Sequence, residues 1–100
     1  MARIIWTEPA LQELDEIADY ISLDNPTVAK KLVREAFKRV DHLAHHPKSG
    51  KLVEEFEATV YREIVLPPCG IFYRLADEIV YIIHVIREEQ FLHLDILKSR

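Results

Sequence analysis

Two helix-start signals in the first third of the chain constrain the fold more than any other feature. Thr7-Glu8-Pro9 places a hydroxyl that can cap a helix before a proline, and Asn25-Pro26 repeats the arrangement with a side-chain amide. Each proline stands in a first helical turn, where its missing N–H costs nothing. Two helices joined by only a few residues favour an antiparallel hairpin, whose apolar sides need a further layer to cover them.

Both predicted helices are amphipathic, and their outer sides carry opposite charge. The first runs to Ile21 with apolar residues on one stripe and acidic residues opposite it. The second keeps the helical spacing to Ala44 and fills its remaining positions with basic residues, which are Lys30, Lys31, Arg34, Lys38 and Arg39. It ends in the segment 45–50, because Pro47 cannot continue a helix and Gly50 completes a turn.

The rest of the chain reads as strands. Residues 2–6 form a short β-prone run, and the later runs 60–66, 71–75 and 78–86 are rich in Val, Ile, Tyr and Phe. The last run is apolar at nearly every position, which predicts a well-shielded central strand. The acidic residues 54–57 are expected in an exposed loop and the tail from 88 to 100 in a short helix. The predicted class is α+β with the order β-α-α-β-β-β, a helical hairpin packed on one face of an antiparallel sheet.

Composition narrows the class of protein. One hundred residues, 49% of them apolar and 30% charged, predict a single domain over residues 1–100. A net charge of −4 disfavours generic nucleic-acid binding. The one cysteine cannot form an internal disulfide, residues 1–6 do not resemble a secretory signal, and no apolar run approaches the roughly 20 residues of a membrane span. These features predict a cytoplasmic protein that has no contact with a membrane.

Several strings, in this order along nearly the whole chain, resemble ParE-type toxins of the RelE/ParE superfamily. They are Trp6-Thr7, Leu14 to Ile21 with Asp19-Tyr20-Ile21, Asn25-Pro26, Leu43 to Pro47 with Gly50, Tyr61-Arg62-Glu63, Pro67-Pro68 and Tyr73-Arg74. The resemblance implies two helices on a three- or four-stranded sheet and a role as the toxin of a type II toxin–antitoxin system. It also implies a cognate antitoxin that wraps the toxin, with which it can form a hetero-oligomer, and a bacterial target. That target is DNA gyrase for ParE-like members and mRNA on the ribosome for RelE-like members.

The resemblance also allows the two chemistries to be compared. Cleavage of RNA without a metal needs a base, an acid and cations to hold the phosphate. The family's cation positions fall on Arg62 and Arg87, but two others fall on Ile64 and Gly70. We therefore predict a binding inhibitor of gyrase, not an enzyme, with no cofactor. Two alternatives stay open: a RelE-like mRNA endonuclease, and a degenerate member that has lost toxicity, because Gly70 also replaces an arginine common in ParE toxins.

Candidate contacts with the target or the antitoxin are Arg62, Arg74, Arg87, Phe91 and Leu94. The three arginines would form a basic strip if the strand register placed them on one face. His84 is expected to be neutral and hydrogen-bonded in the core, with a role as a general base as the alternative. Cys69 follows two prolines and is expected in an exposed turn, with no neighbour that would activate it. The spacing of His42, His45 and His46 could place two imidazoles on one metal ion, but no cysteine or third ligand lies nearby in sequence, so no metal site is predicted.

Overall fold

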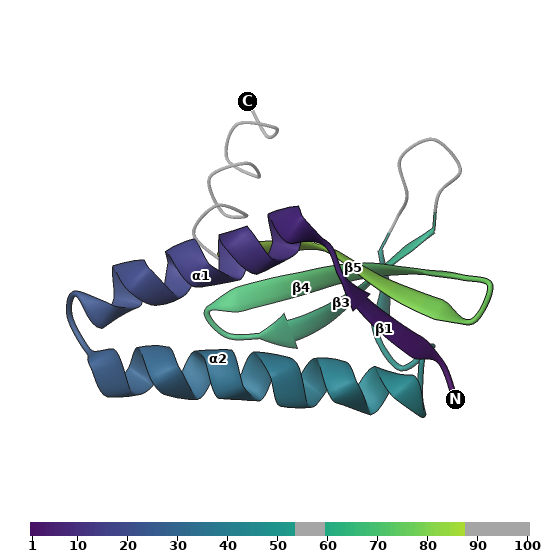
Figure 1. Cartoon of the computed structure of the whole chain (residues 1–100), viewed down its shortest axis with the longest axis horizontal. Coiled ribbons are helices and arrows are strands. Elements are labelled where there is room, and N and C mark those ends of the chain that lie inside the picture. Colours follow the sequence, from purple (N-terminus) through teal and green to yellow (C-terminus); the bar gives the residue numbers. More distant parts are fainter. Residues whose placement is uncertain (54–59, 88–100) are drawn as a thin grey trace.

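Two antiparallel α-helices lie side by side on one face of a five-stranded sheet (Figure 1). This architecture comes from a computed structural model that describes residues 1–53 and 60–87. The elements in chain order are β1 (Arg3–Trp6), α1 (Glu8–Ser22), α2 (Pro26–Asp41), the short 3₁₀ helix η1 (His42–Ala44), β2 (Lys51–Val53), β3 (Tyr61–Leu66), β4 (Cys69–Ala76) and β5 (Ile79–Arg87). The predicted α+β class and the helical hairpin on a sheet are confirmed. The loop predicted at 54–57 and the helix predicted in the tail lie outside the described residues.

Both helix starts form as the sequence predicts. The Thr7 hydroxyl accepts a hydrogen bond from the backbone N–H of Ala10 at 3.4 Å, and the Asn25 side chain accepts one from Val28 at 3.2 Å. Each cap satisfies one of the N–H groups that a helix leaves without an internal partner. No helix in the described part of the chain is long and apolar enough to cross a membrane.

The sheet is mixed, whereas the sequence predicted an antiparallel one. Its strand order is β1-β5-β4-β3-β2, and β1 pairs with β5 in parallel while all other neighbours are antiparallel. The parallel pair arises because both helices intervene between β1 and the rest of the sheet, so β1 joins the edge beside the last strand. The additional strand β2 has three residues, which is too short to show an alternating pattern in the sequence.

The core lies between the helices and the facing side of the sheet. It contains the apolar stripes of α1 and α2 and the inward side chains of the last three strands, among them Ile64, Ile71, Val80, Ile82 and Val85. β5 is an interior strand, as its apolar run predicted. The turn between β4 and β5 is formed by Asp77 and Glu78, which both have positive φ (51° and 62°), as a two-residue hairpin turn requires.

Tyr73 anchors the segment between the helices and the sheet. Its ring is fully buried, and its hydroxyl donates a hydrogen bond to the Pro47 carbonyl at 2.8 Å. The same oxygen accepts the Gly50 N–H at 2.9 Å. A Cβ atom at Gly50 would lie 2.5 Å from that oxygen, so the approach requires glycine. One phenol group therefore holds the exit of α2 against β4.

Tyr73→Phe is predicted to lower the free energy of unfolding by about 1–3 kcal/mol, because it leaves the Gly50 N–H without its acceptor inside the protein. Chemical denaturation monitored by circular dichroism measures the change. Tyr81→Phe is the matched control, since the Tyr81 ring lies on the other side of the sheet, and it should change stability by less than about 0.5 kcal/mol. Equal stabilities for the two variants would contradict this role of the Tyr73 hydroxyl.

Candidate functional site: the groove between α1 and β5

The site begins where β1 stops. β1 pairs with β5 only as far as Trp6, which lies opposite Ile82, and β5 continues to Arg87. Thr7 closes the pairing: its backbone N–H and its hydroxyl both donate to the Ile82 carbonyl, at 3.1 and 2.7 Å. The chain then turns into α1, which packs against β5. Beyond Ile82, α1 lies along β5 on the side where β1 had paired, and no further strand of the described residues pairs with β5 there.

Glu13 satisfies this part of the β5 edge with a side chain. One of its carboxylate oxygens accepts the backbone N–H of Val85 at 3.1 Å and lies 3.2 Å from Nδ1 of His84. The carboxylate thus occupies the position of a strand carbonyl. The prediction that His84 lies in the core is wrong: its side chain is 55% exposed, because the register shift opposite Phe72 and Tyr73 turns it out of the apolar layer.

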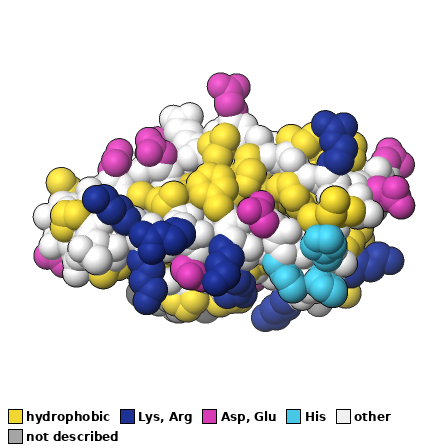
Figure 2. Space-filling view, turned by 60° about the horizontal axis from the view of Figure 1, so that its bottom comes forward, with side chains coloured by type: hydrophobic (Ala, Val, Ile, Leu, Met, Phe, Trp, Pro, Cys, Tyr) yellow, Lys and Arg dark blue, Asp and Glu magenta, His cyan; other side chains and the backbone are white. Residues whose placement is uncertain are grey.

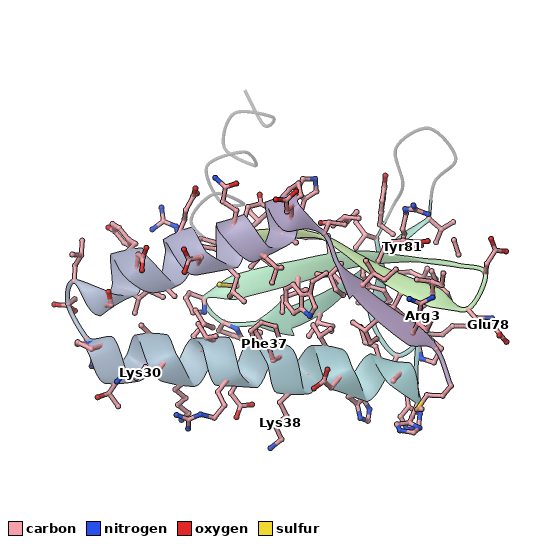
Figure 3. All side chains as sticks on the ribbon, in the orientation of Figure 1. Arg3, Lys30, Phe37, Lys38, Glu78 and Tyr81 are labelled. Carbon is pink, nitrogen blue, oxygen red and sulfur yellow. The ribbon has the colours of Figure 1, made fainter. Side chains whose placement is uncertain are left out.

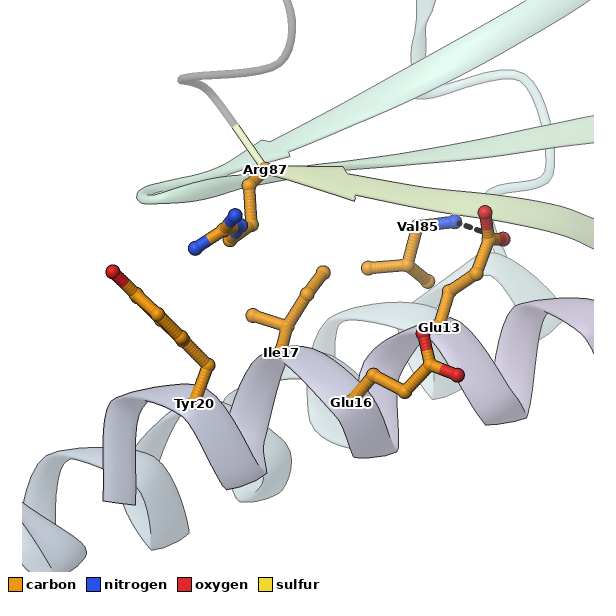
Figure 4. A pocket seen from close by; sticks show the side chains of 6 residues that line it. All are labelled: Glu13, Glu16, Ile17, Tyr20, Val85 and Arg87. Atoms are coloured by element: carbon orange, nitrogen blue, oxygen red, sulfur yellow. Dashed lines mark hydrogen bonds between the residues drawn. The ribbon is translucent and has the colours of Figure 1, made fainter. Parts of the chain in front are cut away.

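A groove of about 290 Å³ opens beside this contact (Figure 4). Its lining comes from one side of α1 and from the end of β5: Glu13, Glu16, Ile17, Tyr20, Val85 and Arg87. The Arg87 guanidinium lies over the Tyr20 ring, 4.5 Å from its centroid, in cation–π geometry. The groove therefore combines one cation and two carboxylates with the side chains of Ile17 and Val85. Such a lining suits a polypeptide better than a phosphate.

Cys69 pairs with Arg87 at the end of the sheet and is buried, which corrects the expectation of an exposed turn residue. Its side chain points into the core because β4 already begins at this residue. Burial raises the pKa of the thiol to about 11, although the charge of Arg87 acts in the opposite direction. The thiol is therefore protonated at neutral pH and is not a nucleophile.

The three candidate arginines do not form one strip. Arg62 lies opposite Tyr73 and donates from one nitrogen to the carbonyls of Lys48 and Gly50, both at 2.8 Å. Arg74 lies over the Tyr81 ring, 4.4 Å from its centroid, on the sheet face away from the helices. Arg87 lies on the helix side, in the groove. Their register places them in three different surroundings.

The other candidates divide between described and undescribed residues. Phe91 and Leu94 lie outside the described residues. His42 and His46 stack with their ring centroids 4.6 Å apart, and the described part of the chain holds no cluster of three or more metal-ligand side chains.

The sequence did not lead us to predict Glu13, Glu16 and Tyr20 as site residues. Their spacing of i, i+3 and i+7 on one side of α1 was the available signal.

Glu13→Ala is predicted to lower the free energy of unfolding by about 1 kcal/mol, because Val85 loses a charge-assisted acceptor. Glu13→Gln keeps an oxygen that can accept the same N–H and should cost less than half as much. Hydrogen exchange at the Val85 amide provides a local measurement, with faster exchange expected in the alanine variant alone. Unchanged exchange in that variant would show that the carboxylate does not hold this edge.

Comparison with known proteins agrees with this architecture. The sequence model of the family described as "ParE toxin of type II toxin-antitoxin system, parDE" matches residues 4–91. The chain is 35% identical over 85 residues to "Toxin RelE2" of Caulobacter vibrioides, an alignment that covers 85% of this chain and 93% of that protein. It is 41% identical over 79 residues to "Putative toxin Y4kP" of Sinorhizobium fredii, with 77% and 79% of the two chains covered.

A solved structure also has this fold. A chain of the "Chromosomal ParDE TA system from P. aeruginosa" superposes with a TM-score of 0.69 and 26% sequence identity, covering 87% of this chain and 96% of that one. The agreement of family model, relatives and fold leads to one conclusion. This chain belongs to the ParE toxin family of type II toxin–antitoxin systems.

Proposed function

We propose that this chain is a cytoplasmic toxin, that a cognate antitoxin holds it inactive and that, when free, it inhibits DNA gyrase by binding it. The proposal rests on the residues found where RNA-cleaving members of the superfamily have cationic side chains. Ile64 is buried in the core, Gly70 has no side chain, and Arg62 is bonded to backbone carbonyls. A phosphodiester would meet few free cations on these strands.

The surroundings of Arg87 support binding over catalysis. Glu13 and Glu16 line the same groove, and their carboxylates oppose the approach of a polyanion. Arg87 is packed on Tyr20, an arrangement common where arginine meets a protein partner. We infer that Arg87 contacts the antitoxin or the target through this groove.

Arg74 is the second proposed contact. It lies on the sheet face that no described helix covers, stacked on Tyr81, where both side chains are half-buried. A stacked arginine loses little conformational freedom on binding, and Tyr and Arg are frequent in the energetic centres of interfaces. Arg62 is a weaker candidate because its guanidinium already holds the segment before β2.

The RelE-like ribonuclease remains the second candidate, and one observation favours it. His84 is exposed and Arg87 stands three residues after it, so an imidazole and a guanidinium lie near the same end of β5. An exposed imidazole can serve as a general base. The name of the Caulobacter vibrioides relative, "Toxin RelE2", points to the same branch.

The test adds the purified chain to gyrase in a DNA supercoiling assay and, separately, to ribosomes translating a defined message. We expect supercoiling to fail while the message stays intact. Arg74→Ala should weaken inhibition about tenfold, the loss expected for one interface arginine, whereas Lys51→Ala, at the far edge strand, should leave it unchanged. Cleavage of the message with normal supercoiling would establish the ribonuclease instead, and no effect in either assay would indicate a degenerate toxin.

A further inference from the structure

The outer sides of α1 and α2 carry rows of opposite charge. Asp15 and Asp19 stand one helical turn apart on α1, and Lys30 and Arg34 have the same spacing on α2; all four side chains are exposed. Asp19, Lys30 and Arg34 line one hollow of about 410 Å³ between the helices. Figure 2 shows Lys and Arg side chains along α2 beside a group of hydrophobic ones.

No direct ion pair joins these rows within the described residues. Over residues 1–53 and 60–87, no carboxylate of α1 lies within 4 Å of a cation of α2, and the Glu13 carboxylate lies beside the His84 imidazole, a contact that is an ion pair only when the ring is protonated. The two exposed rows can therefore form ion pairs with an external surface. A complementary surface would carry a cationic row opposite α1 and an acidic row opposite α2.

Exposed apolar side chains follow the two rows at one end, because Leu11 stands one helical turn before Asp15 and Phe37 one turn after Arg34. Leu11 on α1 is 40% exposed and Phe37 on α2 is 38% exposed. The Phe37 ring packs against Trp6 with a centroid distance of 4.9 Å, which fixes its orientation. Figure 3 shows Phe37 on the side of α2 toward α1 and Lys38 pointing away from it. We call Leu11, Asp15, Asp19, Lys30, Arg34 and Phe37 the outer helical face.

We propose that a second copy of this chain binds the outer helical face, forming a symmetric dimer through the two helix layers. A two-fold axis parallel to the helices places α1 of each copy over α2 of the other, so that each acidic row meets a basic row. A two-fold axis across the helices would place like charges together. The equal i, i+4 spacing of the two rows lets both carboxylates face both cations at once.

This dimer goes beyond the proposed function and does not depend on it, because it concerns the toxin without its target. Leu11 of each copy meets Phe37 of the other, and these side chains supply the apolar part of the contact. The charged rows determine the partner's orientation, and they make the association sensitive to salt.

Sedimentation velocity of the purified chain over a range of concentrations gives the first test. At an ionic strength of about 50 mM, the mass should rise from 11.7 kDa toward twice that value. At about 500 mM, the dissociation constant should rise about tenfold, because charges at the rim of an interface are screened. A mass of 11.7 kDa at every concentration and both salt levels overturns the proposal.

Charge reversal gives the decisive test. The variant Lys30→Glu/Arg34→Glu has two acidic rows, and the variant Asp15→Lys/Asp19→Lys has two basic rows, so each alone should be monomeric. Their mixture should form a heterodimer, because both contacts are then complementary. A single chain with all four substitutions exchanges the rows and should dimerise again. All four positions are exposed, so the fold is expected to persist, and circular dichroism checks it.

Two outcomes would refute the second copy as the occupant. One is a mixture of the charge variants that stays monomeric although the wild-type chain dimerises. The other is a wild-type monomer whose Lys30 is protected from lysine acetylation only when the cognate antitoxin is bound. That result would assign the outer helical face to the antitoxin.

Discussion

Thr7 donates two hydrogen bonds to the Ile82 carbonyl across 75 positions of sequence, and the same hydroxyl caps the helix that follows. This contact joins the first strand to the last and sets the point at which the chain leaves the sheet. Because the chain leaves there, α1 lies across the end of β5, and Glu13 has to satisfy the Val85 N–H in place of a strand. The groove, the cation–π pair of Arg87 and Tyr20, and the placement of the hairpin all follow from where β1 ends.

Local chemistry allowed much of this to be predicted from sequence. The caps at Thr7 and Asn25, the stripes of both helices and the three-stranded meander depend on residues within a few positions of one another. The parallel pairing of β1 could not be predicted, because it depends on which sheet edge is free after the meander has formed. β2 is too short to have a pattern.

The candidate site was harder to predict because it depends on register. A one-residue irregularity between Phe72 and Tyr73 turns His84 to the surface, which no periodic pattern in the strand indicates. The strand register also explains why Arg62, Arg74 and Arg87 lie in three different surroundings. Cys69 is buried because β4 starts one residue after the prolines, so its side chain faces the core.

Electrostatics connect the fold to the proposed mode of action. The acidic side of α1 borders the groove on one flank and the outer helical face on the other. On the strands, Arg62 is bonded to backbone carbonyls, and Arg74 and Arg87 are stacked on tyrosine rings. In the proposed account, the strand surface offers a nucleic acid little positive charge, and the toxin recognises proteins.

Fluorescence anisotropy of a labelled single-stranded RNA titrated with the purified chain tests that claim most directly. We predict weak binding, with a dissociation constant above roughly 100 µM at physiological salt, which is the weak limit of non-specific nucleic-acid binding. Tight binding that weakens steeply with salt and is lost in Arg87→Ala would show that the groove holds phosphate, and it would contradict an account based on protein binding.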